Sequence, residues 1–418
     1  MNNNLGTLKK DYFWNTVGVF AQNAISPILL LIVTRVNGIY DSGVFSFAFS
    51  IAILFWVIAM WGGRTFQISD VNREFSHSSY VTVRLLLAVA VLLGALVFVG
   101  LNDYPVEKTA IIITLVIVKI LESIADVIYG IMQVHGRLYN AGKSLVYKSV
   151  LSVVLFVVVD ILTNNLLLSC AAIIVANAIF IIAYDIPLAR HVDGTKFLPL
   201  KATQNVRNAF AIMLRCWPIF IVSFFSAFSL NIPRYFVDTY HNEQIAYFGI
   251  IAMPVTLIAL VMTFILQPNI VSLSRFLKEN QFSRFEKTVK NIIGITSLLG
   301  LVILVVSYLI GVQLLQVLFG VDFTQYRVAL VVLVIGAALN AVGAIFTNLL
   351  VIARRFKAQV YILLATNILL LAACVPVVNN TGLLGAVYLY SAVNLLQVIL
   401  FGMAYYVTLK GLKNAKKD

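Results

Sequence analysis

The chain has 418 residues, of which 61% are hydrophobic and only 11% are Asp, Glu, Lys or Arg, and its mean hydropathy is +0.97. A water-soluble domain carries about 25% charged residues, so this chain has too little polar surface to cover its apolar residues in water. The net charge of +13 is spread over short clusters between apolar runs, which excludes a single basic patch for nucleic acid and indicates the loops of a membrane protein.

Twelve apolar runs follow one another along the chain, and each is long enough for a helix to cross a membrane, which takes about 20 residues. The segments between the runs are short, so none of them can form a separate extramembrane domain. The first run is too long for a cleaved signal peptide and is expected to remain as the first helix. The sequence therefore predicts an all-α integral membrane protein. The runs are 12–36, 44–63, 81–101, 109–133, 145–163, 167–186, 209–232, 244–267, 290–311, 326–352, 358–378 and 383–408.

The basic residues are distributed unequally between the two sides of the membrane that these helices would define. With the N-terminus in the cytoplasm, 25 of the 30 lysines and arginines fall on the cytoplasmic side, because four lie outside and Lys119 lies within a run. This asymmetry follows the positive-inside rule and predicts an even number of helices with both termini in the cytoplasm. The four outer residues are Arg35, Lys108, Arg234 and Arg327.

The two halves of the chain resemble each other in sequence. Arg35 at the end of the first run is followed by Asp41, and Arg234 near the end of the seventh run is followed by Asp238. Six helices in each half would give both halves the same orientation, related by pseudo-two-fold symmetry about an axis along the membrane normal. We therefore predict two six-helix lobes, residues 1–200 and 201–418, with cargo bound in the cleft between them.

The fourth run carries a stripe of polar and charged side chains within an otherwise apolar segment. Spacings of three or four residues place them within an arc of about 80° on a helix. A charge near the middle of a bilayer costs about 2.5–3.5 kcal/mol, so the stripe must face the interior of the bundle. It either lines a cargo cavity, with a carboxylate that could couple protons or sodium, or contains a structural ion pair. The stripe consists of Lys119, Glu122, Asp126, Tyr129 and Gln133.

Uncharged polar residues form similar stripes in other runs. Asn15 and Gln22 share one face of the first run, and Asn394 belongs to a polar stripe on the twelfth. Residues of this kind commonly join helices by hydrogen bonds within a membrane. The abundance of amides and tyrosines relative to charges also suits a hydroxyl-rich cargo such as a sugar. We include these three residues among the candidates for the cavity.

Three arginines lie near the predicted ends of helices. Arg35 and Arg234 occupy equivalent places in the two halves, near the outer ends of the first and seventh runs. Because arginine binds phosphate through two hydrogen bonds, this pair could receive a diphosphate, or each side chain could simply extend to the membrane interface. Arg215 lies a few residues into the seventh run, and it could contact a phosphate on the cytoplasmic side or serve as a positive-inside anchor.

Several features argue against enzymatic chemistry and against bound metals or cofactors. The stretch from Gly136 to Ser144 is similar to a nucleotide-binding loop, but it has one residue too many between its glycines and no strand precedes it. The three cysteines are isolated in apolar runs, and the four histidines are scattered without ligand spacing. The sequence therefore predicts a protein that is not an enzyme, with no cofactor, no metal site and no nucleic acid as partner.

Residues 272–291 lie between the eighth and ninth runs and mix apolar with basic side chains. Phe276, Phe282 and Phe285 alternate with Arg275 and Arg284. Such a mixture is typical of helices that lie on an anionic membrane surface. We expect this segment to form one amphipathic helix on the cytoplasmic leaflet.

An ordered set of motifs along essentially the whole chain resembles one family of membrane proteins. The motifs are Asn15 to Pro27 leading to Thr34-Arg35, Tyr40 to Phe45, Gln67 to Asp70, Glu122 to Gln133 continuing to Arg137 and Gly142-Lys143, Ile232 to Tyr235, and Leu318 to Gly320. In this set the chain is similar to the polysaccharide repeat-unit flippases of the Wzx type. These belong to the MOP superfamily, which also contains the MATE drug exporters and the lipid II flippase.

The resemblance implies a two-lobed, MATE-like transporter in the bacterial inner membrane. It would move an undecaprenyl-diphosphate-linked oligosaccharide from the cytoplasmic to the outer leaflet by alternating access, with positive cavity residues meeting the diphosphate. Membrane lipids surround such a protein, and glycosyltransferases and a polysaccharide polymerase would be its partners. The product would be O-antigen, capsule, exopolysaccharide or a wall polymer. Twelve helices, and the lack of an arginine pair low in the first two, argue against lipid II as cargo.

Two other functions are compatible with parts of this pattern. A MATE-like exporter of drugs or small organic cations would use Glu122 and Asp126 for ion coupling or cargo binding, but Lys119 and the two outer arginines suit an anionic cargo better. A membrane glycosyltransferase or polysaccharide polymerase would be expected to carry a large outer loop or a catalytic acidic motif, and the outer loops here are too short.

Overall fold

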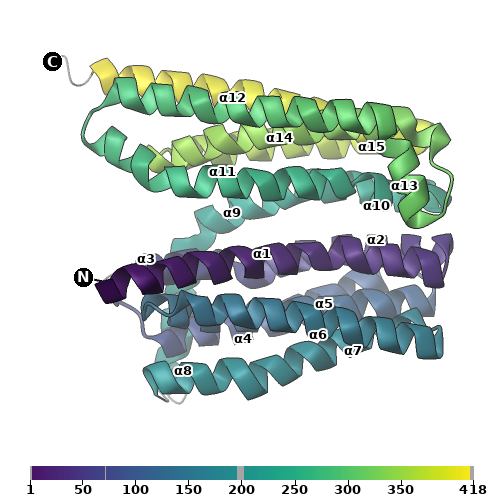
Figure 1. The fold of residues 1–418 in the computed structure, drawn as a ribbon, viewed down its shortest axis with the longest axis horizontal. Coiled ribbons are helices and arrows are strands. Elements are labelled where there is room, and N and C mark those ends of the chain that lie inside the picture. Colours follow the sequence, from purple (N-terminus) through teal and green to yellow (C-terminus); the bar gives the residue numbers. More distant parts are fainter. Residues whose placement is uncertain (1, 71, 195–201, 415–418) are drawn as a thin grey trace. The chain divides into compact units, whose positions relative to one another are not determined.

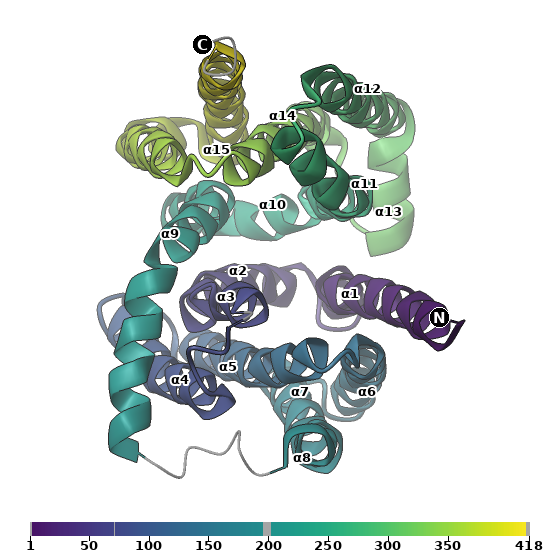
Figure 2. The same cartoon turned by 90° about the vertical axis from the view of Figure 1, so that its left-hand side faces the viewer.

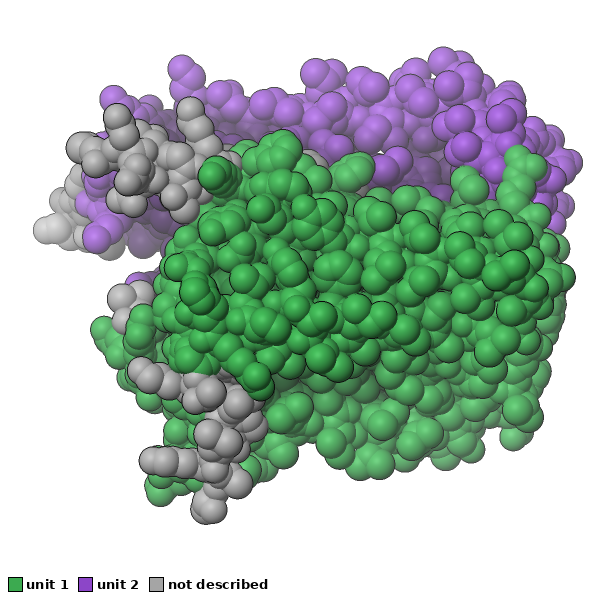
Figure 3. Space-filling view, turned by 60° about the horizontal axis from the view of Figure 1, so that its bottom comes forward, with its two compact units in different colours: residues 1–227 green, residues 228–418 purple. Residues whose placement is uncertain are grey.

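The computed structural model describes residues 2–70, 72–194 and 202–414, and almost all of them are helical (Figure 1). The chain divides into two compact units, residues 1–227 and 228–418 (Figure 3). The boundary falls within α9 (Ala202–Tyr240), whereas the predicted lobe boundary at 200/201 lies outside the described residues.

The first half of α9 completes unit 1, and its second half begins unit 2. The other helices of unit 1 are α1 (Asn2–Val36), α2 (Ile39–Met60), α3 (Gly63–Ser69), α4 (His77–Gly100), α5 (Val106–Val134), α6 (Leu138–Thr163), α7 (Leu166–Phe180) and α8 (Ile186–Asp193). The other helices of unit 2 are α10 (Ile245–Ile251), α11 (Met253–Lys278), α12 (Phe282–Val306), α13 (Val312–Phe319), α14 (Arg327–Ile352) and α15 (Phe356–Asn414).

Ten helical stretches of the described chain are long and apolar enough to cross a membrane. One of them, α15, has 59 residues and is interrupted at Gly382, so it supplies two membrane-length segments. A further membrane-length helix is α5, whose 29 residues include the charged stripe and which therefore falls outside the ten. Counted in this way, the described residues contain the twelve transmembrane helices that the sequence predicts.

The break in α15 depends on a glycine. Gly382 has φ 59° and ψ −140°, a conformation that only glycine adopts readily. A Cβ atom there would lie 2.5 Å from Oε1 of Gln244, and this oxygen accepts a 2.8 Å hydrogen bond from the backbone N–H of Leu383. The amide of Gln244 thus satisfies a backbone donor that the interrupted helix leaves free.

The centre of unit 1 is α5, because α2, α4, α6 and α7 all pack against it (Figure 2). Glu122, Asp126 and Tyr129 on this helix are buried, so the prediction that the stripe faces the interior of the bundle agrees with the structure. On the surrounding helices, apolar side chains such as Leu93 of α4 and Val154 of α6 are exposed. Exposed apolar surface of this kind is what a lipid-facing helix presents.

α1 and α6 approach each other closely at a pair of glycines. A Cβ atom on Gly142 of α6 would lie 2.3 Å from the carbonyl carbon of Trp14, and one on Gly18 of α1 would lie 2.6 Å from the carbonyl oxygen of Gly142. Asp11 of α1 also accepts a 2.7 Å hydrogen bond from the backbone N–H of Tyr139, in the first turn of α6. Small residues permit such backbone contact between membrane helices, so Gly142 has a packing role.

Replacing Gly142 by valine is expected to destabilise unit 1, because the new side chain would collide with the backbone of α1. Overpacking of this kind costs about 1–3 kcal/mol or more. Thermal unfolding of the purified protein in detergent should show a lower melting temperature. Gly100→Ala is the matched control, since nothing lies within 4 Å of a Cβ atom at this helical glycine. Equal stability of Gly142→Val and the wild type would contradict the close contact.

The end of α2 is held against the first half of α9. Trp61 has a positive φ of 44°, and its ring stacks on that of Phe220 with 3.8 Å between centroids. Its indole N–H donates a 3.0 Å hydrogen bond to the carbonyl oxygen of Met213. This contact anchors α9 on unit 1 before the helix continues into unit 2.

In unit 2, α14 packs against α11, α12 and α15. The Leu318 to Gly320 motif ends α13, with Gly320 in the left-handed conformation at φ 73°. Asp322 follows in the turn before α14, where hydrogen bonds from the Thr324 side chain and backbone and from Gln316 lower the pKa of its carboxyl group. The motif is therefore a helix-ending turn.

One predicted element is wrong. Residues 272–291 do not form a single amphipathic helix, because α11 ends at Lys278 and α12 begins at Phe282. Asn280 between them has a positive φ of 58°, which breaks the helix. The mixture of phenylalanines and basic residues belongs to the ends of two membrane-length helices and the tight turn that joins them.

Candidate functional site

The five predicted residues of α5 do not form one cavity wall but divide into three groups along the helix. Lys119 and Glu122 line a pocket, Asp126 and Gln133 bind arginine, and Tyr129 belongs to a buried network with a lysine. Since a helix turns by 100° per residue, even a narrow stripe meets different neighbours at successive turns.

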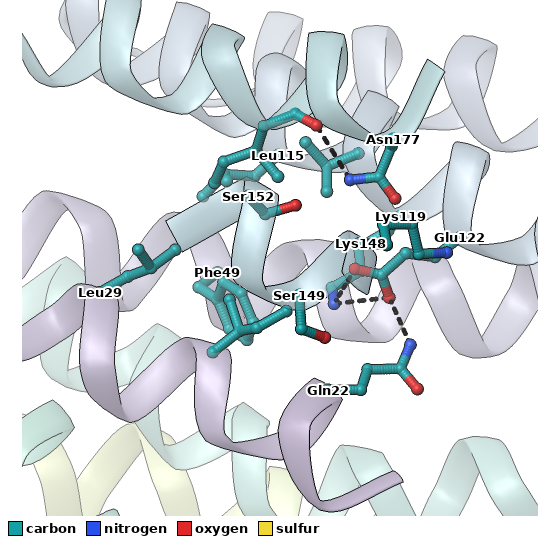
Figure 4. A pocket seen from close by; sticks show the side chains of 13 residues that line it. Gln22, Leu29, Phe49, Leu115, Lys119, Glu122, Lys148, Ser149, Ser152 and Asn177 are labelled. Atoms are coloured by element: carbon teal, nitrogen blue, oxygen red, sulfur yellow. Dashed lines mark hydrogen bonds and ion pairs between the residues drawn. The ribbon is translucent and has the colours of Figure 1, made fainter. Parts of the chain in front are cut away.

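The pocket lies within unit 1, between α1, α2, α5, α6 and α7 (Figure 4). Its lining includes two lysines, one carboxylate, two amides and two hydroxyls alongside apolar side chains. The lining residues are Gln22, Ile25, Leu29, Phe49, Leu115, Val118, Lys119, Glu122, Lys148, Ser149, Ser152, Ile173 and Asn177.

An ion pair occupies one side of the pocket. Nζ of Lys119 lies 2.9 Å from Oε2 and 3.0 Å from Oε1 of Glu122, one helical turn away. Nε2 of Gln22 donates a 3.3 Å hydrogen bond to the same carboxylate from α1. The ammonium group of Lys119 also lies 4.8 Å from the centre of the Phe49 ring. The structural ion pair and the cavity wall that the sequence left as alternatives are therefore present together.

The other side of the pocket offers polar atoms without protein partners. Oγ of Ser152 and Oδ1 of Asn177 are buried and make no hydrogen bond within the described chain. Lys148 contributes a second ammonium group, whose side chain is only 4% exposed. Because buried polar atoms are nearly always hydrogen-bonded, this wall is suited to a polar ligand or to ordered water.

Asp126 is held between two arginines. Arg64 of α3 donates to Oδ1 at 3.1 Å, and Arg84 of α4 donates to Oδ2 at 2.9 Å. The second terminal nitrogen of Arg64 donates a 3.0 Å hydrogen bond to Oε1 of Gln133. This cluster joins α3, α4 and α5, and Asp126 is not among the pocket residues. Its carboxylate therefore has a structural position.

Arg84 also completes the end of α2. Its Nη1 donates to the carbonyl oxygens of Ala59, at 2.7 Å, and of Met60. The last carbonyls of a helix have no partner within the helix, and a cation there also interacts favourably with the helix dipole. Only 2% of the Arg84 side chain is exposed. The interactions with these carbonyls and with Asp126 therefore offset the free-energy cost of burying its charge.

Tyr129 connects the pocket to a widened turn between α7 and α8. Its hydroxyl accepts a 2.9 Å hydrogen bond from Lys148, lies 3.0 Å from Oγ of Ser144, and donates to Oδ2 of Asp185 at 3.5 Å. Asp185 ends a π-helical turn, Ile181–Asp185, and such turns are frequent at functional sites. Through Tyr129, the carboxylate of Asp185 is linked to the ammonium group that enters the pocket.

Three other predicted residues of unit 1 lie away from the pocket lining, whereas Gln22 is part of it. Asn15 is half-buried beside Gly142, at the contact of α1 with α6. Arg35 is exposed in the last turn of α1. Arg215 forms an exposed ion pair with Glu74 and lies over the Phe75 ring, so it ties α9 to the segment before α4.

The two predicted residues of unit 2 are both enclosed by their own unit. Arg234 is half-buried, with its guanidinium 5.2 Å from the centre of the Phe248 ring, and its Nε has no hydrogen-bond partner within the described chain. Asn394 is buried and donates a 2.8 Å hydrogen bond to the carbonyl oxygen of Tyr390. Arg234 and Arg35 therefore differ in environment despite their similar sequence positions.

Several residues of the site were not predicted from the sequence. Lys148 and Arg84 were assigned to the cytoplasmic side by the positive-inside count, yet both are buried within unit 1. Their position inside or next to apolar runs could have indicated a buried role, because a long basic side chain there must either reach the membrane interface or pair with another polar group.

Comparisons with known proteins agree with this fold. No family model matches the chain. The capsular polysaccharide biosynthesis protein CapF of Staphylococcus aureus is 22% identical over 374 residues, which cover 88% of this chain and 92% of that protein. An inward-facing multidrug resistance MATE family transporter of the MOP superfamily has a TM-score of 0.70 at 13% identity, covering 94% of this chain and 95% of its own.

Two further solved structures have the same fold. The MATE multidrug transporter DinF-BH, in complex with R6G, has a TM-score of 0.70 at 17% identity and covers 96% of this chain and 95% of its own. A MOP superfamily transporter from Pyrococcus furiosus, described as having a binding pocket of reverse polarity, has a TM-score of 0.62 at 14% identity, with coverage of 97% and 96%. The chain therefore has the fold of the MOP-superfamily transporters. The three solved structures are of transporters, and the comparisons agree with the resemblance found in the sequence motifs.

Proposed function

We propose that this protein is a MOP-superfamily transporter that flips an undecaprenyl-diphosphate-linked oligosaccharide from the cytoplasmic to the outer leaflet of the bacterial inner membrane, with both termini in the cytoplasm. The observation that carries the proposal is the pocket of unit 1, where Lys119 and Lys148 outnumber the single carboxylate of Glu122. Amides and hydroxyls fill most of the remaining polar lining. Such a lining favours an anionic cargo that is rich in hydroxyl groups.

The name of the Staphylococcus aureus relative supports the same class of cargo, since that protein takes part in capsular polysaccharide biosynthesis. A lipid-linked repeat unit must cross the membrane between its assembly in the cytoplasm and its polymerisation outside. Glycosyltransferases would therefore supply the substrate of this transporter, and a polysaccharide polymerase would consume its product.

Export of organic cations is supported less well by these contacts. An exporter of cations needs a carboxylate free to meet them, but Glu122 is paired with Lys119 and Asp126 with two arginines. Glu122 is also the carboxylate of the pocket that could accept a proton or bind sodium. Coupling through it would require the ion pair with Lys119 to open.

The proposal is tested by deleting the gene in its host and following the lipid-linked oligosaccharides. Complete repeat units should accumulate facing the cytoplasm, so that a membrane-impermeant glycosidase added to spheroplasts fails to reach them. Surface polymer should disappear and should return when the wild-type gene is restored. Unchanged polymer, with unchanged lipid-linked intermediates and no second flippase in the genome, would refute the proposal and favour cation export.

A further inference from the structure

Three side chains that commonly bind metals converge at one end of unit 1, away from the pocket. His77, His135 and Asp193 each offer one ligand atom, and these atoms all lie within 4.8 Å of one another. The residues belong to three different helix ends, separated by more than fifty residues of sequence each. The four histidines are scattered along the sequence without ligand spacing, and the fold brings two of them together.

Local structure fixes the position of each of these residues. His77 is the first residue of α4, directly after Ser76, whose hydroxyl accepts a hydrogen bond from the backbone N–H of Ser79. His135 follows the last residue of α5. Asp193 is the last residue of α8, because Gly194 takes a positive φ of 64° and ends the helix. All three residues are partly buried.

Two polar atoms of this cluster have no hydrogen-bond partner within the described chain, and a third nitrogen faces the carboxylate. Nδ1 of His77 and Oδ2 of Asp193 are buried and make no hydrogen bond within the described chain. Nδ1 of His135 lies 2.9 Å from the carbonyl oxygen of Ile131, and because a carbonyl only accepts, this nitrogen carries the proton. Nε2 of His135 is therefore unprotonated, and its lone pair faces Asp193. The distance from this nitrogen to Oδ1 of Asp193 is 3.8 Å, which is too long for a hydrogen bond.

We propose that His77, His135 and Asp193 bind a divalent zinc ion. Two imidazoles and a carboxylate are a common donor set for zinc, with water as a fourth ligand. The hydrogen bond from His135 to a backbone carbonyl is the outer contact that typically orients a zinc-binding histidine. Zinc–ligand bonds of about 2.0–2.1 Å place the ligand atoms of a tetrahedral site roughly 3.3 Å from one another. Side-chain rotations that move these atoms by little more than an ångström would therefore bring them to zinc-binding distance.

Zinc at this position would link the start of α4 and the ends of α5 and α8. Asp193 also precedes, in the chain, the connection from α8 to α9, which continues into the second unit. The ion would thus restrain three helix ends of unit 1. This role is independent of the cargo, so the proposal does not rest on the proposed function.

The test is metal binding by the purified full-length protein. The protein should be isolated in detergent through a tag without histidines, stripped with a chelator, and titrated with zinc chloride by calorimetry, with the bound metal counted by mass spectrometry. Cobalt chloride provides a second probe, since four-coordinate cobalt gives a characteristic visible absorption. The variants are His77→Asn, His135→Asn, Asp193→Asn and the triple variant. His191→Asn is the matched control, because it removes an exposed histidine from the same helix as Asp193.

We expect the stripped wild type and His191→Asn to bind one zinc ion per chain with micromolar affinity or better. Each single site variant should weaken binding at least tenfold, and excess zinc should raise the melting temperature of the wild type but not of the triple variant. The proposal is overturned if the well-folded wild type takes up no zinc, or if the triple variant binds as much as the wild type.

Discussion

Replacing Asp126 by alanine is expected to prevent most of the protein from accumulating in a folded form. Arg84 would then be buried with no carboxylate beside it, and Arg64 would lose the same partner. Removing one member of a buried ion pair costs about 3–5 kcal/mol. This is a large part of the 5–15 kcal/mol by which proteins are usually stable. The melting temperature in detergent and the yield of monodisperse protein measure the effect.

The chain offers a matched comparison in the ion pair of Arg215 with Glu74, where both side chains are about half exposed, at 52% and 53%. Glu74→Ala should change stability by at most about 1 kcal/mol, since exposed pairs contribute little. A double variant, Asp126→Leu with Arg84→Met, should be more stable than Asp126→Ala because the deeply buried charge of Arg84 is removed together with its partner. Arg64 also loses Asp126 in this variant, but its side chain is 24% exposed and therefore partly solvated. If Asp126→Ala were as stable as the wild type, the cluster would not be structural, and Asp126 would be available for a role in transport.

The fold could be predicted largely from the sequence because a bilayer imposes a simple rule on it. Each crossing needs about 20 apolar residues, and loops of this chain are short, so twelve runs give twelve helices. Even α5, whose charges depart from that rule, is identifiable because its charges share one face. The apolar runs do not specify where each helix ends. The segment 272–291 has the composition of one amphipathic helix, but the positive φ of Asn280 divides it between two helices.

The site was less predictable because it depends on contacts between distant parts of the chain. The stripe on α5 includes Lys119 and Glu122, which line the pocket of unit 1, as expected of charges within the membrane, which must face inward. It could not reveal that Asp126, one turn further on, would meet Arg64 and Arg84 from two other helices. Likewise, nothing in their spacing indicated that His77, His135 and Asp193 would converge, because only the fold places these three helix ends together.

Lys148→Met is expected to abolish most transport while leaving the fold intact. If the pocket receives the anionic part of the cargo, the variant loses a charged hydrogen bond worth about 1.5–3 kcal/mol, which corresponds to roughly a tenfold to 150-fold loss. The hydroxyl of Tyr129 keeps Ser144 and Asp185 as partners. Restoration of surface polymer in the deletion strain, normalised to the amount of transporter in the membrane, measures the loss.

Two companion variants separate the loss of pocket charge from a change in stability. Lys143→Met removes a lysine one turn earlier on α6 that packs against Trp14 outside the pocket, and it should retain transport. The double variant Lys148→Met with Asp185→Asn removes the opposite charge as well, so no buried carboxylate is left without a cation nearby. The double variant should be stably folded and still inactive, because the positive charge of the pocket remains absent.

The outcomes of these variants bear directly on the path of the cargo. Recovery of transport in the double variant would mean that Lys148 serves only to balance Asp185, and the cargo would then bind elsewhere in the transporter. Full activity of Lys148→Met at normal protein levels would exclude the pocket of unit 1 as a binding site for the anionic group. Inactivity of both variants beside an active Lys143→Met would require an ammonium group at this position, as expected where a negatively charged cargo passes between α1, α5 and α6.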